Sequence, residues 1–114
     1  MIKEVVVTTI DADGRAHLAP LGIIEDEKGW IIAPFRPSKT LDNLMRSPIA
    51  VVNYIDDARV FAGLVTGRRD WALQPTIPGE PPRLAAALAH ARFSVFHVEN
   101  HIERPRLYCA CGPI

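Results

Sequence analysis

The chain has 114 residues, 48% of them hydrophobic, which is enough for one domain whose core needs neither a disulfide nor a structural metal. Its formal net charge is zero, so it lacks the basic excess of a nucleic-acid-binding domain. The apolar runs are too short to span a membrane, and the N-terminus lacks the features of a signal peptide. Cys109 and Cys111 could only close a small, strained ring. We therefore expect reduced thiols in a cytoplasmic protein without membrane or nucleic-acid partners.

The first part of the chain predicts an antiparallel meander of three strands. The β-branched stretch Glu4–Ile10 is typical of a strand, and Ala16–Ile24 predicts a second one. The turn Asp11–Arg15 between them contains Asp-Gly, which supplies the positive φ that a hairpin needs. A second polar turn, Glu25–Gly29, leads into a third predicted strand, Trp30–Phe35.

A short helix is predicted directly after this meander. The Arg-Pro step before it disfavours helical geometry, so the chain is expected to turn there. Ser38 or Thr40 can cap the helix that follows. Leu41, Leu44 and Met45 recur at helical spacing and are expected to place one face of the helix on the core.

The start of this helix is a candidate anion site. Its first N–H groups have no helical partner and lie at the positive end of the helix dipole. Arg36 and Lys39 add positive charge, and Ser38 and Thr40 add hydroxyl donors. Phosphate groups are bound in such places. The residues alone leave open the alternative of an ordinary capped helix with solvated basic side chains.

The middle of the chain is less regular. Ile49–Ile55 predicts a fourth strand, whereas periodicity does not decide between a helix and a strand for Arg59–Val65. The stretch 66–82 is rich in proline and glycine and predicts an irregular segment, which is either functional or mobile. Trp71 and Leu73 are large apolar residues within it and are expected to attach it to the body of the protein or to a partner.

The remaining sequence predicts two more strands. Leu84–Ala91 has high helix propensity, but it can also run directly into the next strand. Arg92–Glu103 alternates between two faces and predicts a strand, and Arg106–Ala110 predicts the last one. Short strands at regular spacing, with one or two small helices, indicate a mainly β protein with a closed β-barrel.

Four blocks of sequence, in this order, resemble the FMN-binding split-barrel superfamily: Ala19–Ile23, Pro34–Leu44, Ala50–Asp57 and Val60–Ala62. Within it the chain is most similar to an uncharacterised family, domain of unknown function 447 (DUF447), and the order of its parts is similar to that of flavin reductase domains. The resemblance covers residues 2–62 well and the C-terminal half loosely. It implies one split-barrel domain over residues 1–114, shortened at its C-terminus relative to the family.

The resemblance also implies a function. Such proteins are homodimers that bind FMN near the subunit interface, so a flavin-dependent oxidoreductase of the flavin reductase type is expected, with an unknown substrate. A nicotinamide from NAD(P)H could lie on the exposed face of the flavin, so the missing Gly-rich dinucleotide motif is uninformative. The phosphate ligands that the resemblance implies are in the basic turn: Arg36, Ser38, Lys39 and Thr40.

Further cofactor contacts are implied outside this turn. The strand beside the isoalloxazine ring would offer small residues and backbone N–H groups at Ala19, Leu21 and Gly22. Asn43 and Asn53 are candidates for polar contacts to the ribityl chain or the ring. Each amide is equally compatible with an ordinary position on a helix surface or at a strand end.

Other interpretations stay open. His17 lies on the strand that leads to the flavin and is the best single candidate for proton transfer, although a polar strand residue is the simpler interpretation. A zinc site could be formed by His97, His101, Cys109 and Cys111, but a strand separates the two histidines by about 13 Å. A third class of function is a dimeric module that binds a flavin or another ligand without turnover.

Overall fold

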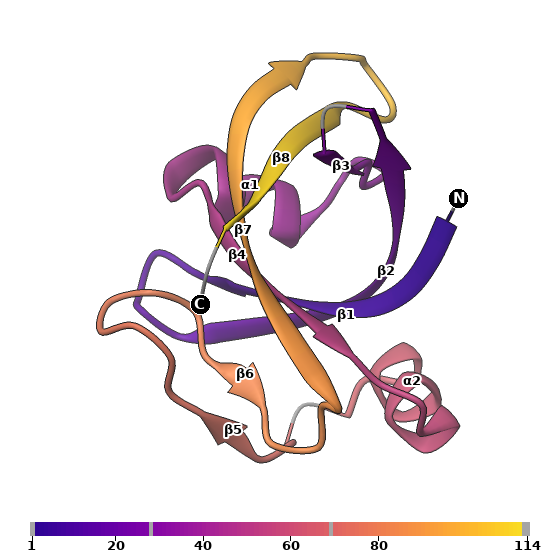
Figure 1. The fold of residues 1–114 in the computed structure, drawn as a ribbon, viewed down its shortest axis with the longest axis vertical. Coiled ribbons are helices and arrows are strands. Elements are labelled where there is room, and N and C mark those ends of the chain that lie inside the picture. Colours follow the sequence, from indigo (N-terminus) through magenta and orange to yellow (C-terminus); the bar gives the residue numbers. More distant parts are fainter. Residues whose placement is uncertain (1, 28, 69, 113–114) are drawn as a thin grey trace.

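The computed structural model describes residues 2–27, 29–68 and 70–112, and its main feature is a closed barrel of six antiparallel strands. The strands follow one another around the barrel in the order β1, β2, β3, β8, β7 and β4 (Figure 1). Their bounds are Ile2–Ile10 (β1), Ala16–Asp26 (β2), Gly29–Ile32 (β3), Ile49–Tyr54 (β4), Ala89–Glu99 (β7) and Arg106–Gly112 (β8). The mainly β fold and the closed barrel predicted from the sequence are therefore confirmed.

Two glycines allow the tight connections between the first three strands. Gly14 has a φ of 81°, as the predicted Asp-Gly hairpin requires. Gly29 has a φ of 142°, and a Cβ atom there would lie 2.5 Å from the carbonyl oxygen of Cys109. Asp26 still pairs with Gly29. The second turn is therefore shorter than the predicted Glu25–Gly29 turn.

The alternation of side chains along β1 separates two hydrophobic cores. Val5 and Val7 pack inside the barrel, where Phe93 is the largest fully buried side chain. Val6 belongs to an outer core, which also contains Leu18 of β2 and Leu84. The inner core is completed by buried residues of the other four barrel strands and the first helix: Ile23, Ile32, Leu41, Leu44, Ala50, Val52, Leu107 and Cys109.

Helix α1 (Lys39–Arg46) forms where the sequence predicts it and packs on the inner core through Leu41 and Leu44. The prediction that Met45 also faces the core is wrong, because its side chain is 60% exposed. A residue that directly follows Leu44 lies about 100° further around the helix and so turns toward solvent. Asn43 is buried instead.

Helix α2 (Ala58–Val65) resolves the alternative that periodicity left open for Arg59–Val65. Asp57 caps it, since its carboxylate accepts a hydrogen bond from the backbone N–H of Arg59 at 2.9 Å. Val60 and Leu64 place the helix on the outer core. Within the described residues, no helix is long and apolar enough to cross a membrane.

The irregular segment 66–82 lies on the same side of the barrel as α2 (Figure 1). Trp71 packs against the outer core, which confirms its predicted role as an attachment point. The short strand β5 (Leu73–Gln74) pairs with β6 (Arg83–Leu84) to form a separate two-stranded sheet. The side chain of Leu73 is 39% exposed and is not part of the outer core, so the prediction that it attaches the segment to the body of the protein is wrong.

The stretch 84–91 does not form the helix that its composition favours. β7 begins at Ala89 and pairs from there with β4, with Ala89 opposite Tyr54. Pairing with a buried strand therefore overrides local helix propensity from Ala89 onward, whereas residues 85–88 connect β6 to β7, so the predicted direct run into the strand holds only for the last part of the stretch. β7 ends at Glu99, so residues 100–103 form a loop and not the end of a strand.

Candidate functional site

The basic turn joins β3 to α1. β3 ends at Ile32, before the predicted Phe35, and the Arg36–Pro37 peptide bond is cis. Ser38 is the N-cap residue, with a φ of −143°, and its Oγ accepts a hydrogen bond from the backbone N–H of Leu41 at 3.1 Å. Ser38 and not Thr40 therefore caps the helix. The other N–H groups of the first helical turn have no helical partner and stay available to an anion.

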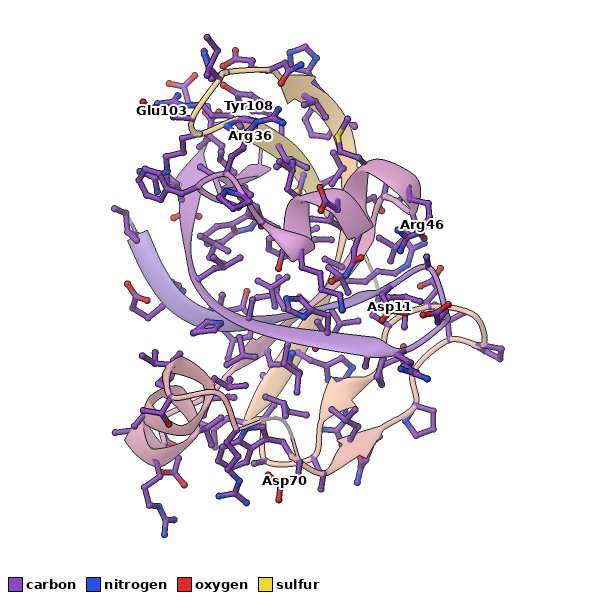
Figure 2. All side chains as sticks on the ribbon, turned by 180° about the vertical axis from the view of Figure 1, so that it is seen from behind. Asp11, Arg36, Arg46, Asp70, Glu103 and Tyr108 are labelled. Atoms are coloured by element: carbon purple, nitrogen blue, oxygen red, sulfur yellow. The ribbon has the colours of Figure 1, made fainter. Side chains whose placement is uncertain are left out.

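One cavity lies on each side of the start of α1. The first, which we call the Asp11 cavity, has a volume of about 480 Å³. It is lined by Asp11, Ala12, Asp13, Pro37, Ser38, Lys39, Asp42, Asn43 and Arg46. The second, the Arg36 cavity, has a volume of about 410 Å³ and is lined by Arg36, Pro37, Ser38, Leu41 and Asp42. Figure 2 shows Arg36 on one side of α1, and Asp11 and Arg46 on the other.

The Asp11 cavity has more negative than positive side chains. It contains three carboxylates, from Asp11, Asp13 and Asp42, and two cations, from Lys39 and Arg46. Lys39 forms an ion pair with Asp11 at 3.6 Å, so part of its charge is already neutralised. The pKa of Asp11 is lowered, mainly by the hydrogen bond from the Arg15 backbone N–H in the hairpin turn, and Lys39 contributes less. This cavity is therefore a poor place for a dianionic phosphate.

The Arg36 cavity has the better charge balance for an anion. Its only ionisable side chains are one guanidinium, from Arg36, and one carboxylate, from Asp42. The hydroxyl-bearing cap residue Ser38 lines the same cavity. The partial positive charge of the helix start adds to the guanidinium, so the Arg36 cavity is the side on which we expect a phosphate.

Two further predicted ligands lie beneath the turn. Thr40 is buried and lines neither cavity. Asn43 is also buried, and its Nδ2 donates to Thr9 Oγ1 at 2.9 Å, which joins α1 to β1. Asn43 Oδ1 accepts a hydrogen bond from Arg46 Nη2 at 3.3 Å, and the same nitrogen donates to the carbonyl oxygen of Ile10 at 2.7 Å. The amide of Asn43 thus orients a second arginine at the Asp11 cavity.

Arg46, which lines the Asp11 cavity, was not predicted from the sequence as a candidate site residue. Its position in the last turn of α1, three residues after Asn43, was the available signal, because residues three apart on a helix lie side by side. Basic residues are common in last helical turns for electrostatic reasons alone, so the signal is weak.

The three residues predicted beside the flavin ring lie on a partly free strand edge. Along β2, residues 16–22 pair with β1, whereas pairing with β3 begins only at Ile23. Among the described residues, the other edge of β2 therefore has no strand partner at Ala19, Leu21 and Gly22. A backbone edge of this kind offers N–H and C=O groups to a ligand. These residues do not line either of the two cavities at the helix start.

Asn53 lies in the outer core, apart from the basic turn. Its Nδ2 donates to the carbonyl oxygen of Val6 at 2.9 Å and to Thr8 Oγ1 at 2.8 Å. Its Oδ1 accepts a hydrogen bond from the backbone N–H of Leu84 at 2.8 Å. The fully buried amide thus joins β4, β1 and β6.

The structure also shows where the residues of the alternative proton-transfer and zinc sites lie. His17 is half-buried on β2, opposite Thr9. Cys109 is buried in the barrel, and this burial raises the pKa of its thiol to about 12. His97 is in ring contact with Tyr108, with centroids 5.5 Å apart. Within the described ranges 2–27, 29–68 and 70–112, no three histidine, cysteine or acidic side chains gather closely enough to hold a metal ion.

The barrel, its capped helix and the partly free β2 edge place the protein among the split-barrel proteins. A protein from Shewanella frigidimarina with a split barrel domain matches it with a TM-score of 0.83 at 10% identity, over 98% of this chain and 65% of that one. The sequence model of the N-terminal domain of the protein of unknown function DUF447 matches residues 3–113. The chain therefore belongs to the DUF447 family, which confirms the resemblance identified from the sequence.

Two more solved structures have the same fold. An FMN-bound protein of Methanosarcina mazei, assigned to the DUF447 family, matches with a TM-score of 0.84 at 17% identity, over 98% of this chain and 59% of that one. The flavin reductase of a styrene monooxygenase from Pseudomonas putida matches with a TM-score of 0.77 at 13% identity, over 98% and 79%. No curated protein matches the sequence. The chain thus spans less than two thirds of the length of the M. mazei and Shewanella proteins.

Proposed function

We propose that this chain binds FMN and acts as a flavin-dependent oxidoreductase of the flavin reductase type. The main support for this proposal is that a solved protein of the same family, from M. mazei, is bound to FMN and has a fold that matches 98% of this chain. When bound, FMN would supply the two-electron redox chemistry, and the protein would bind and orient it.

The FMN phosphate is proposed to bind in the Arg36 cavity. Arg36 and Ser38 line this cavity, whereas Lys39 lines the Asp11 cavity, is paired with Asp11 and adds its charge only at longer range. Thr40 is buried and lines neither cavity, so it is proposed to support the turn from within and not to touch the phosphate. We assign the phosphate to this cavity because it has one cation and one carboxylate, whereas the Asp11 cavity has more carboxylates than cations.

The flavin ring is proposed to lie along the free edge of β2. Ala19 and Leu21 would contribute backbone groups there, because Leu21 packs its side chain against the inner core and Ala19 pairs with core residue Val7. Gly22 has no side chain to keep a ring at a distance. Asn43 is proposed to support the site from within the protein, because its amide already bonds to Thr9. Asn53 is proposed to hold β4, β1 and β6 together without touching the flavin.

We further propose a homodimer with the flavin near its interface. Phe35 directly precedes the basic turn, Met45 lies in the last turn of α1, and their side chains are 64% and 60% exposed. Exposed large apolar side chains beside a ligand site favour contact with a partner.

NADH or NADPH is the proposed electron donor. A cytoplasmic location, where both are present, agrees with the free thiols of Cys109 and Cys111.

The phosphate site is tested by comparing FMN with riboflavin, which lacks the phosphate. The double variant Arg36→Ala, Lys39→Ala should weaken FMN binding by at least about tenfold, because Arg36 supplies one charged contact and Lys39 adds charge at longer range, and should leave riboflavin binding nearly unchanged. Arg59→Ala, which removes an exposed cation from α2, is the matched control. Equal FMN affinity in the double variant and the wild type would contradict the proposed phosphate site.

Turnover separates the oxidoreductase from a non-catalytic flavin-binding module. Among the described residues, neither cavity at the helix start is lined by a histidine or a cysteine, so a module that binds flavin without turnover is kept as the second candidate. Oxidation of NADH or NADPH by the FMN-loaded protein, at a rate above that of free FMN, would support the enzyme. Stable FMN binding without any such oxidation would support the module.

A further inference from the structure

Arg36 is held by a loop that lies far from it in the sequence. This β7–β8 loop comprises residues 100–105, between β7 and β8. Arg36 Nη2 donates to Asn100 Oδ1 at 2.5 Å, and Arg36 Nε donates to the carbonyl oxygen of His101 at 3.3 Å. The backbone N–H of Arg36 donates to the carbonyl oxygen of Glu103 at 2.8 Å. Figure 2 shows Arg36 and Glu103 side by side at one end of the molecule.

A second arginine attaches the same loop to the same turn. Arg104 Nε donates to the carbonyl oxygen of Ala33 at 2.8 Å. The Arg104 guanidinium also lies over the ring of Phe35, 4.4 Å from its centroid. The backbone of the loop is therefore fixed against residues 33–36 independently of Asn100. What Asn100 adds is a contact to the guanidinium of Arg36.

This contact leaves part of the guanidinium available. An arginine side chain carries five N–H donors in a rigid plane. Asn100 and His101 occupy two of them, on Nη2 and Nε. Within the described residues the other three have no hydrogen-bond partner, and Arg36 lines the cavity to which we assign the phosphate. Because the guanidinium is planar, fixing one edge also fixes the direction of the remaining donors.

We propose that Asn100 is a positioning residue that sets the preference of this site for phosphorylated flavin. It orients Arg36, and Arg36 then binds the phosphate with its free N–H groups. The inference rests on the proposed FMN function and deepens it. Without Asn100 the long side chain of Arg36 regains rotamer freedom, and binding the phosphate must order it again.

The test measures affinity for FMN and for riboflavin, by quenching of flavin fluorescence, in wild-type protein and variants. Asn100→Ala should lower FMN affinity by about tenfold, the size expected when one long side chain must be ordered again on binding, and change riboflavin affinity by less than about twofold. In an Arg36→Ala background, Asn100→Ala should have no further effect on either ligand, because Asn100 acts through Arg36. Ile102→Ala is the matched control, since this residue of the same loop is 92% exposed.

The outcomes are distinguishable. A wild-type chain that binds neither flavin would overturn the proposed function and this inference together. Wild-type FMN binding with an unchanged FMN-to-riboflavin ratio in Asn100→Ala would overturn the inference alone. An equal loss for both flavins, or a further loss of FMN affinity in the Arg36→Ala background, would assign Asn100 a general structural role and also overturn it.

Discussion

Replacing Asn53 with alanine should lower the free energy of unfolding by about 3 kcal/mol. The substitution removes three hydrogen bonds of the buried amide, to Val6, Thr8 and Leu84. Leu84 is 1% exposed, so its backbone N–H would remain buried without a partner. One such unsatisfied group costs about 1–3 kcal/mol, and the loss of the two donated bonds adds to this.

The assay is urea denaturation followed by tryptophan fluorescence. Gln74→Ala is the matched control: it removes an exposed amide that bonds to Arg83, and should change stability by less than about 0.5 kcal/mol. FMN affinity of the folded Asn53→Ala protein should stay close to that of the wild type. A stability loss under about 1 kcal/mol, or a large loss of FMN affinity at unchanged stability, would refute the structural role of Asn53.

Three other predictions follow from single contacts. Gly63→Ala should destabilise the protein by about 1–2 kcal/mol in urea denaturation, because a Cβ there would lie 2.5 Å from a ring carbon of Trp71; wild-type stability would contradict this packing. A thiol reagent at neutral pH should modify Cys111 quickly and Cys109 only after denaturation, since Cys111 is exposed and the buried Cys109 has a pKa of about 12. Equal rates would argue against the barrel interior as the location of Cys109. The pKa of Glu80 is lowered from 4.5 by hydrogen bonds from an arginine of β7, so Glu80 stabilises the fold above pH 4.5 and this contribution disappears as the pH falls through its lowered pKa. Thermal unfolding of Glu80→Gln should therefore depend less on acidic pH than that of the wild type, and equal pH dependence would contradict the pairing.

Local patterns predicted much of the barrel. The β-branched run of β1 and the positive φ of Gly14 are determined by neighbouring residues, so the hairpin is visible in the sequence. The same holds for the Ser38 cap, whose partner is three residues away. Helix periodicity placed Leu41 and Leu44 on the core, but it also included Met45, because a short helix gives few positions with which to define its buried face.

Features that depend on distant segments were not predictable. Ala89–Ala91 joins a strand because β4 offers it a partner, although its composition favours a helix. The amide of Asn53 bonds to Leu84, 31 residues away, and Arg36 bonds to Asn100, 64 residues away. Sequence reasoning could name Arg36 as a candidate anion ligand, but only the fold shows which part of its guanidinium is already occupied.

The most direct test of the central claim is a titration of the purified protein with FMN, followed by gel filtration and visible absorption. The account predicts that a flavin band stays with the protein at one FMN per chain, and that riboflavin is retained less well. Failure of the folded protein to retain or bind FMN on reconstitution would contradict the proposed function.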